Sequence, residues 1–363
     1  MSDLQREWMT PFWEGTLCYR ETFAMVGANG ICRAPFLWQP SRVLCVESYD
    51  GTMCYEDGKD YLVERDELVV PDGSRIPVTD WESWVYSNRE IAVRKGKGNS
   101  FAEEFGPMAA TDGGFLNLCA VGRPEVLTAC QIAVTYETER KQVSAAPTCE
   151  LEYLPRLVQR LQTEEQVTVV LYGDSISCGY DCSGLYGQKP YQPIWAELLQ
   201  HRMNEQWGQR VQFHNMSLGG ADSDWAIRNA GERVGCYHPD LAILGFGMND
   251  RCGGAEYREK TRALMECIRR ESPETEFLLI ATTLPNALAK TPPHYFCAHQ
   301  SEYSDSLQEL TGSGVALADM QSVQKEIEKR KRYIDLSGNW LNHPNDYLAR
   351  IQGQVVMKTL GLE

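Results

Sequence analysis

The spacing of apolar and polar positions divides the chain into two parts with different periods. Up to about residue 148, short apolar runs alternate with turn signals, including Asp-Gly pairs at 50–51, 57–58, 72–73 and 112–113. These pairs supply the positive φ angles that tight turns need. A longer apolar stretch covers residues 126–137, and no convincing helical period interrupts the pattern. We therefore predict an all-β sandwich or jelly-roll domain over residues 1–148.

From about residue 149 the pattern alternates between helical and strand periods. Apolar residues recur at helical spacing over 150–162 and 257–272, with Pro155 in the first turn of the first of these helices. Continuous apolar runs at 167–173, 241–247 and 276–284 are typical of buried parallel strands. The alternation predicts a flavodoxin-like, three-layer α/β/α parallel sheet over residues 149–363.

Candidate chemistry lies where the predicted strands end. The first strand runs into Asp174 and Ser175, the second into residues 215–221 with two adjacent glycines, and the third into Asn249, while a late loop carries His343. In open parallel sheets, functional groups gather beyond the carboxyl ends of the strands. A hydroxyl nucleophile, an imidazole base and N–H donors are the groups that acyl transfer requires.

Four sequence blocks, in order over residues 165–360, resemble the SGNH (GDSL-type) hydrolase superfamily: G-D-S, N-x-S-x-G-G, G-x-N-D and H-P-N-D. The resemblance implies that Ser175 is the nucleophile and His343 the general base. It also implies an oxyanion hole made by the N–H of Ser175, the N–H of Gly220 and the side chain of Asn249. Two-domain carbohydrate O-acetylesterases of this superfamily are similar in carrying an N-terminal β-sandwich. Residues 149–363 would then be the catalytic domain and residues 1–148 an accessory domain.

The sequence departs from the superfamily at one position. The family usually has Asp three residues before its histidine, and here Trp340 occupies that place. Two alternatives remain: a Ser–His dyad whose ring is oriented by a backbone carbonyl, or an acid from elsewhere, for which Asp335 is the nearest preceding candidate. Trp225 and Trp340 are candidates to line the pocket because they lie close in sequence to Gly220 and His343. Asp174 is a further pocket candidate, although an Asp before a helix is more typical of a cap.

Charge, hydropathy and cysteine spacing limit the kinds of partner and cofactor that we expect. The formal net charge is −15, from 35 Lys+Arg against 50 Asp+Glu, which disfavours nucleic acid because phosphate contacts need clustered basic side chains. The first residues lack a signal-peptide pattern, and no apolar run approaches the roughly 18 residues of a membrane span. The 13 cysteines include no C-x-x-C pair, which favours reduced thiols in the cytoplasm over a disulfide framework or a zinc site. We expect no metal or other cofactor and no membrane partner, and the oligomeric state, a homo-oligomer included, stays open.

The substrate is inferred from the aromatic residues and from the resemblance. Five of the nine tryptophans fall within the first 90 residues, and indole faces stack well on sugar rings, although they also fill β-sandwich cores. We predict a serine esterase that removes acetyl groups from carbohydrates such as acetylated hemicellulose oligosaccharides. The alternatives are a lipid or thioester hydrolase of the same superfamily and a carbohydrate-binding protein with a decayed site. The basic glycine cluster at residues 94–98 is expected to be an exposed hairpin.

Overall fold

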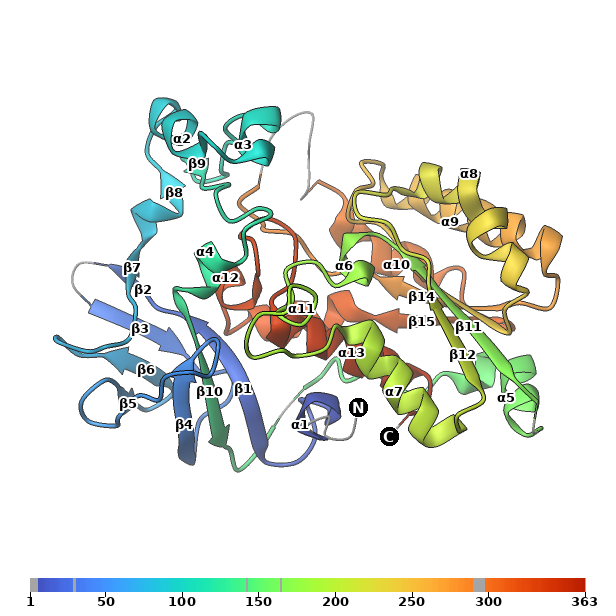
Figure 1. Ribbon diagram of the computed structural model, residues 1–363, viewed down its shortest axis with the longest axis horizontal. Helices are drawn as coiled ribbons and strands as arrows, with labels where there is room; N and C mark the ends of the chain where they lie inside the picture. The colour runs from blue at the N-terminus through green and yellow to red at the C-terminus, as the bar shows by residue number, and fades with distance from the viewer. Residues whose placement is uncertain (1–5, 29–30, 142, 164, 290–297, 363) are drawn as a thin grey trace.

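The computed structural model describes residues 6–28, 31–141, 143–163, 165–289 and 298–362 (Figure 1). A β-rich N-terminal region lies beside an α/β region built on a parallel sheet. No helix within these ranges is long and apolar enough to cross a bilayer.

The α/β region contains a five-stranded sheet in the order β12-β11-β13-β14-β15, in which every neighbouring pair is parallel. Its strands are β11 (Val167–Gly173), β12 (Val211–Asn215), β13 (Leu241–Gly245), β14 (Glu276–Ala281) and β15 (Val315–Asp319). Alternate side chains of a strand point to opposite faces, so Val169 and Leu171 join one apolar core and Val170 and Tyr172 join the other. The predicted three-layer parallel fold is therefore confirmed.

Helices cover both faces of this sheet. One core contains residues of α7 (Trp195–Trp207), α11 (Met320–Glu328) and α13 (Asp346–Thr359). The opposite core contains residues of α8 (Ser223–Arg233), α9 (Gly254–Glu271) and α10 (Tyr303–Gln308). The remaining short helices of this region are α5 (Pro155–Leu161), which has Pro155 in its first turn as predicted, α6 (Ser175–Cys178) and α12 (Tyr333–Leu336). Single 3-10 turns occur at Leu151–Tyr153, Gly235–Tyr237 and Gln300–Glu302.

The β-rich region contains two larger sheets that share one apolar core. The three-stranded sheet has the order β1-β10-β4 and consists of β1 (Leu17–Ala24), β4 (Arg42–Ser48) and β10 (Gln131–Glu137). The five-stranded sheet has the order β5-β6-β3-β2-β7 and consists of β2 (Val26–Ala28), β3 (Ile31–Pro35), β5 (Leu62–Glu64), β6 (Glu67–Val70) and β7 (Thr79–Asp80). Phe23 and Val134 of the first sheet pack in the same cluster as Ala34 and Leu68 of the second, as expected for a sandwich.

The all-β prediction is wrong for part of this region. Helices α2 (Arg89–Gly96) and α3 (Ser100–Phe105) lie between the short strands β8 (Val85–Tyr86) and β9 (Phe115–Leu116), and α4 (Glu125–Thr128) precedes β10. The basic glycine cluster therefore ends a helix and is not a hairpin. The side chains of Asn88 and Asn99 accept hydrogen bonds from the third residue after each and so begin α2 and α3. A further short helix, α1 (Arg6–Met9), precedes β1, and a 3-10 turn covers Trp81–Ser83.

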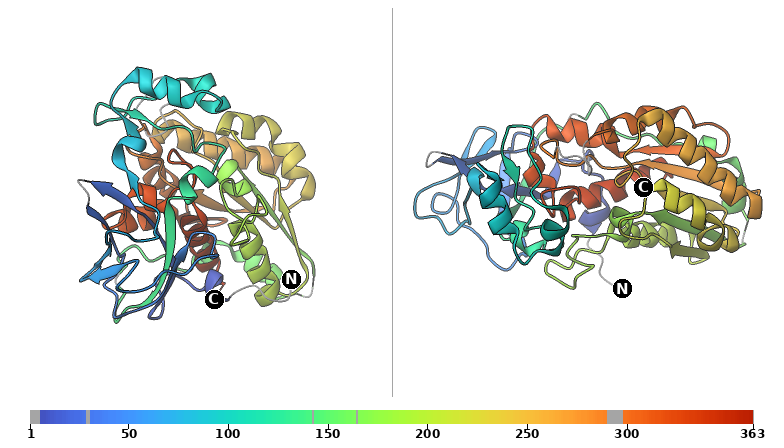
Figure 2. Two further views of the ribbon diagram at one scale, coloured as in Figure 1. Left: turned by 60° about the vertical axis from the view of Figure 1, so that its left-hand side comes forward. Right: turned by 90° about the horizontal axis from the view of Figure 1, so that it is seen from above.

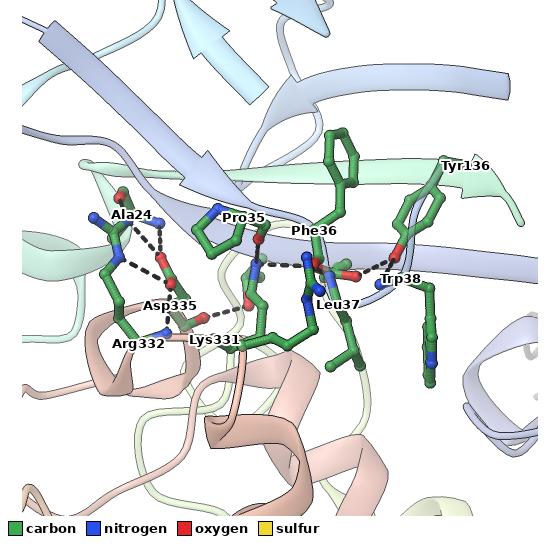
Figure 3. Close-up of polar contacts among 12 residues, drawn as sticks. Ala24, Pro35, Phe36, Leu37, Trp38, Tyr136, Lys331, Arg332 and Asp335 are labelled. Atoms are coloured by element: carbon green, nitrogen blue, oxygen red, sulfur yellow. Dashed lines mark hydrogen bonds and ion pairs between the residues drawn. The ribbon is translucent and has the colours of Figure 1, made fainter. Parts of the chain in front are cut away.

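Buried polar groups join the two regions (Figure 3). The Lys331 ammonium and the Glu21 carboxylate lie 2.8 Å apart with both side chains fully buried, and Lys331 also donates to the carbonyl of Pro35. Next to this pair, the Asp335 carboxylate accepts the backbone N–H of Ala24 at 2.7 Å and pairs with Arg332 at 3.0 Å. Because buried charges are costly unless paired, these contacts hold the segment before His343 against the N-terminal strands.

Candidate active site

Ser175 lies at the junction of β11 and α6, where the backbone is tightly packed. A Cβ at Gly173 would meet the carbonyl of Gly245 at 2.5 Å, so only glycine allows this close approach of β11 and β13. Asp174 caps α6 by accepting the N–H of Ile176 at 3.0 Å. The side chain of Ser175 thus emerges at the carboxyl end of the sheet, as predicted.

His343 meets Ser175 across the fold. The hydroxyl Oγ of Ser175 lies 2.8 Å from Nε2 of His343. The loop that carries His343 is held by Asn339, whose side-chain oxygen accepts the backbone N–H groups of Leu341, Asn342 and His343 at 2.9, 3.0 and 3.1 Å. The structure therefore brings together the predicted nucleophile and the predicted base.

The other ring nitrogen of His343 faces an acid that the sequence analysis did not name. Nδ1 of His343 lies 2.6 Å from Oδ2 of Asp181, whose side chain is 2 % exposed. An ionised carboxylate can only accept a hydrogen bond, so Nδ1 carries the hydrogen and the lone pair of Nε2 faces Ser175. This is the tautomer that a general base requires.

Local backbone geometry positions Asp181. The residue has a positive φ of 66°, which Asp tolerates better than most residues. A Cβ at Gly338 would lie 2.7 Å from the Cβ of Asp181, so glycine at 338 leaves room for this loop. Asp181 is the only acid between Ser175 and Glu197 in the sequence, a signal that could have drawn attention to it.

Two of the residues that the sequence suggests for the site do not lie at the reactive centre. Asp335 is fully buried and its carboxylate serves Ala24 and Arg332, so it braces the two regions and does not orient His343. Trp340 is also buried; its ring packs against Trp81 and Trp84, and its indole N–H donates to the carbonyl of Trp84 at 3.0 Å. Both residues are buried for the same reason, because the N-terminal region covers the segment before His343.

Two of the three predicted oxyanion groups, Gly220 and Asn249, line a cavity of about 700 Å³. Gly220 has a φ of +78°, and Asn249 donates one hydrogen of its side-chain amide to the carbonyl of Ala221 at 3.0 Å, leaving its second amide hydrogen for another acceptor. Phe101 and Phe105 of α3 line the same cavity, and Figure 2 shows that α3 projects from the β-rich region over this end of the molecule. The N-terminal region therefore contributes side chains to the cavity that contains Gly220 and Asn249.

Tyr180 is a further residue that the sequence analysis missed. Its ring meets the ring of His343 edge-on, with centroids 5.9 Å apart, and is 40 % exposed. A Cβ at Gly219 would lie 2.9 Å from the Tyr180 hydroxyl, so the absence of a side chain at 219 leaves room for this ring. Tyr180 therefore lies between the imidazole and the glycine pair.

The remaining pocket candidates occupy supporting positions. Asp174 is fully buried, and burial raises its pKa to about 7, so it braces the nucleophile turn without lining the pocket. Trp225 is half-buried on α8, with its ring centroid 5.9 Å from that of Tyr172 and the guanidinium of Arg233 over it. Across the described part of the chain, no cluster of three or more His, Cys, Asp or Glu side chains is arranged to hold a metal ion.

A comparison with protein families finds a match to this chain. Residues 171–351 match the model of the GDSL-like Lipase/Acylhydrolase family. No curated protein matches the chain.

Solved structures resemble the chain at low sequence identity. A two-domain esterase active on acetylated mannans is 17 % identical, with a TM-score of 0.46 over 60 % of this chain and 54 % of that one. A carbohydrate esterase of family 3 from Talaromyces cellulolyticus is 16 % identical, with a TM-score of 0.41 over 53 % of this chain and 94 % of that one. A catalytic mutant of an acetylxylan esterase from Geobacillus stearothermophilus is 14 % identical, with a TM-score of 0.43 over 56 % and 97 %. The chain covers about half the length, 54 %, of the first of these structures. Residues 171–351 are therefore a domain of the GDSL-like Lipase/Acylhydrolase family.

Proposed function

We propose that the protein is a serine esterase that removes acetyl groups from carbohydrates, with acetylated hemicellulose oligosaccharides as substrates. The observation that carries the proposal is the line of contacts from Ser175 Oγ to His343 Nε2 at 2.8 Å and from His343 Nδ1 to Asp181 Oδ2 at 2.6 Å. In this proposal residues 149–363 form the catalytic domain and residues 1–148 an accessory domain. A cytoplasmic location stays a prediction.

The mechanism follows from the roles of these atoms. Ser175 Oγ attacks the ester carbonyl while Nε2 of His343 takes its proton, and the resulting imidazolium is stabilised by the Asp181 carboxylate. The oxyanion of the tetrahedral intermediate is bound by the N–H groups of Ser175 and Gly220 and the second amide hydrogen of Asn249. The bond from the carbonyl carbon to the sugar oxygen then breaks, and the His343 imidazolium protonates that oxygen so that it leaves as a hydroxyl. Water, deprotonated by His343, attacks the acetyl-enzyme and releases acetate.

The lining of the cavity at Gly220 and Asn249 favours a sugar over a long acyl chain. Two aromatic rings, Phe101 and Phe105, are part of the lining and suit the apolar face of a pyranose. The lining also includes the charged residues Asp222, Asp224, Asp250, Arg251 and Lys260. A fatty acyl chain would bury apolar surface against these charged groups, which is unfavourable.

The proposal is tested by acetate release from acetylated xylo- and manno-oligosaccharides, together with a series of p-nitrophenyl esters of increasing chain length. We expect hydrolysis of acetyl esters that is lost in Ser175→Ala and kept in Ser41→Ala, an exposed serine just before β4 that donates to the carbonyl of Glu137. A preference for long acyl chains would favour the lipid or thioester alternative. Sugar binding without turnover would favour the decayed carbohydrate-binding alternative, against which the intact Ser175–His343 contact argues.

A further inference from the structure

A second cavity lies between the β-rich region and the loop that follows α6. Its volume is about 640 Å³, within the roughly 300–1,000 Å³ of typical small-molecule sites. Four segments form its walls: residues 48–55 at the end of β4, residues 75–77, residues 124–131 around α4, and residues 181–191 of the α/β region. We call it the interface cavity. It shares no lining residue with the cavity at Gly220 and Asn249.

The interface cavity reaches the reactive centre from the side of Asp181. Asp181 contributes to its wall and contacts Nδ1 of His343, whereas Ser175 contacts Nε2. Asp181 therefore separates the interface cavity from the imidazole, on the side of the ring away from Ser175. A chain-like substrate with its ester at Ser175 would have to pass beside this ring to place a remote sugar in the interface cavity.

Large exposed side chains, two of them aromatic, line the interface cavity. Tyr186, Tyr191 and Met53 are 43 %, 56 % and 44 % exposed, and all three line the cavity. Large apolar side chains gathered at an exposed concave surface mark a binding site more often than isolated ones do. Flat phenol rings offer faces on which a sugar ring can stack.

The charges around the interface cavity are largely compensated within the protein. Asp50 accepts hydrogen bonds from Ser48 and Thr52, Arg75 pairs with Asp60, and Glu125 pairs with Arg123. Lys189 adds one positive charge to a wall that also contains Asp50. No single sign of charge dominates, so the cavity suits a neutral ligand better than a phosphate or a polyuronate.

We propose that the interface cavity is a binding site for a neutral oligosaccharide segment, with sugar rings stacked on Tyr186 and Tyr191. The inference rests on the proposed function, because it assigns to this cavity the part of the substrate chain remote from the ester. Short polar side chains such as Ser48, Thr52 and Gln188 line the same walls and supply partners for sugar hydroxyls.

The first test is direct binding. In the Ser175→Ala background, unacetylated xylopentaose and mannopentaose are titrated into the full chain by calorimetry. We expect one of them to bind, and the double change Tyr186→Ala with Tyr191→Ala to weaken its Kd about tenfold or more. The change of both residues to Phe keeps the rings and should restore most of the affinity. Leu62→Ala, an exposed apolar residue on β5, serves as the matched control.

The second test uses turnover, so that failure of this proposal can be told from failure of the proposed function. The ratio of kcat/KM for an acetylated pentasaccharide to that for p-nitrophenyl acetate should fall about tenfold in the double Ala variant, through KM. An unchanged ratio in an active enzyme would overturn the saccharide site and leave the esterase standing. Binding of a pentasaccharide that needs the two tyrosines, without any ester hydrolysis, would support the site and overturn the esterase. Absence of saccharide binding in both tests overturns the site.

Discussion

The Asp181 carboxylate lies 2.6 Å from Nδ1 of His343, although the two residues are 162 positions apart in the sequence. Family resemblance places the orienting acid in the histidine's own loop, where this chain has the buried Trp340. Here the acid comes from the loop that follows the nucleophile. A Ser–His–acid arrangement depends on geometry and not on the order of residues along the chain, so this placement is chemically equivalent.

Asp181→Asn should lower kcat strongly while leaving the fold intact. The amide keeps the shape of the carboxylate but cannot stabilise the imidazolium, and it favours the tautomer with the hydrogen on Nε2. We expect kcat for p-nitrophenyl acetate to fall about a thousandfold or more, as in other triads. Asp72→Asn, in an exposed turn, is the control. Retention of more than a tenth of the activity would mean that a backbone group orients the ring.

Asp335→Ala should act on stability and leave the chemistry nearly intact. The change leaves Arg332 without its carboxylate and the N–H of Ala24 without its acceptor, in a buried place. We expect the free energy of unfolding to fall by about 3–5 kcal/mol, with kcat per folded molecule within a few-fold of the parent. Denaturant unfolding and active-site titration separate the two effects. A loss of kcat as large as that of His343→Ala, in a folded variant, would contradict the bracing role.

Asp174 should make stability depend on pH in a defined direction. Burial raises the pKa of this carboxyl from 3.8 to about 7, so between about pH 4 and pH 7 the folded state holds a proton that the unfolded state has released. This contribution to stability is complete below about pH 4 and is lost as the pH rises toward 7. Asn at 174 can accept the Ile176 N–H equally well but does not titrate. We therefore expect the stability of Asp174→Asn, relative to the parent, to rise by a few kcal/mol between pH 4.5 and pH 8 in urea unfolding. A difference that stays constant with pH would contradict this assignment.

Gln131→Ala should show that contacts from the N-terminal region support catalysis. Its side-chain amide donates to the carbonyls of Ile334 and Ser337 at 2.7 and 2.9 Å, and its oxygen accepts from Asn345 at 3.3 Å. Removing it leaves buried backbone carbonyls of the His343 segment unpaired, at a cost of about 1–3 kcal/mol for each group. We expect lower stability together with a several-fold lower kcat, because the imidazole is less firmly placed. The Gln131→Glu variant retains an acceptor for Asn345 but not the donors, so an activity equal to the parent there would show that the two donated bonds do not matter.

The sequence predicts the parts of the site that belong to single strand ends. Ser175 and Asn249 follow continuous apolar strands, and His343 begins a recognisable block, so their convergence at one edge of the sheet is expected from the parallel fold. Asp181 could not be assigned in the same way, because its contact depends on how the loop after α6 lies against Gly338. The burial of Asp335 and Trp340 is hidden from the sequence for a related reason. No local pattern reveals that β1 and β10 cover the segment at Asp335 or that Trp81 and Trp84 cover Trp340. The helices at residues 89–105 were missed because the frequent turn signals around them are equally typical of strands.

The arrangement of Figure 3 also bears on how the enzyme is made. Ser175 is synthesised 168 residues before its base His343, while the strands that receive the His343 segment are synthesised before both. If the proposed function holds, a nascent chain presents Ser175 with an unactivated hydroxyl, and cleavage of esters begins only when the late segment docks on the strands already made. The onset of turnover during synthesis would consequently time the closing step of folding, with the enzyme serving as its own reporter.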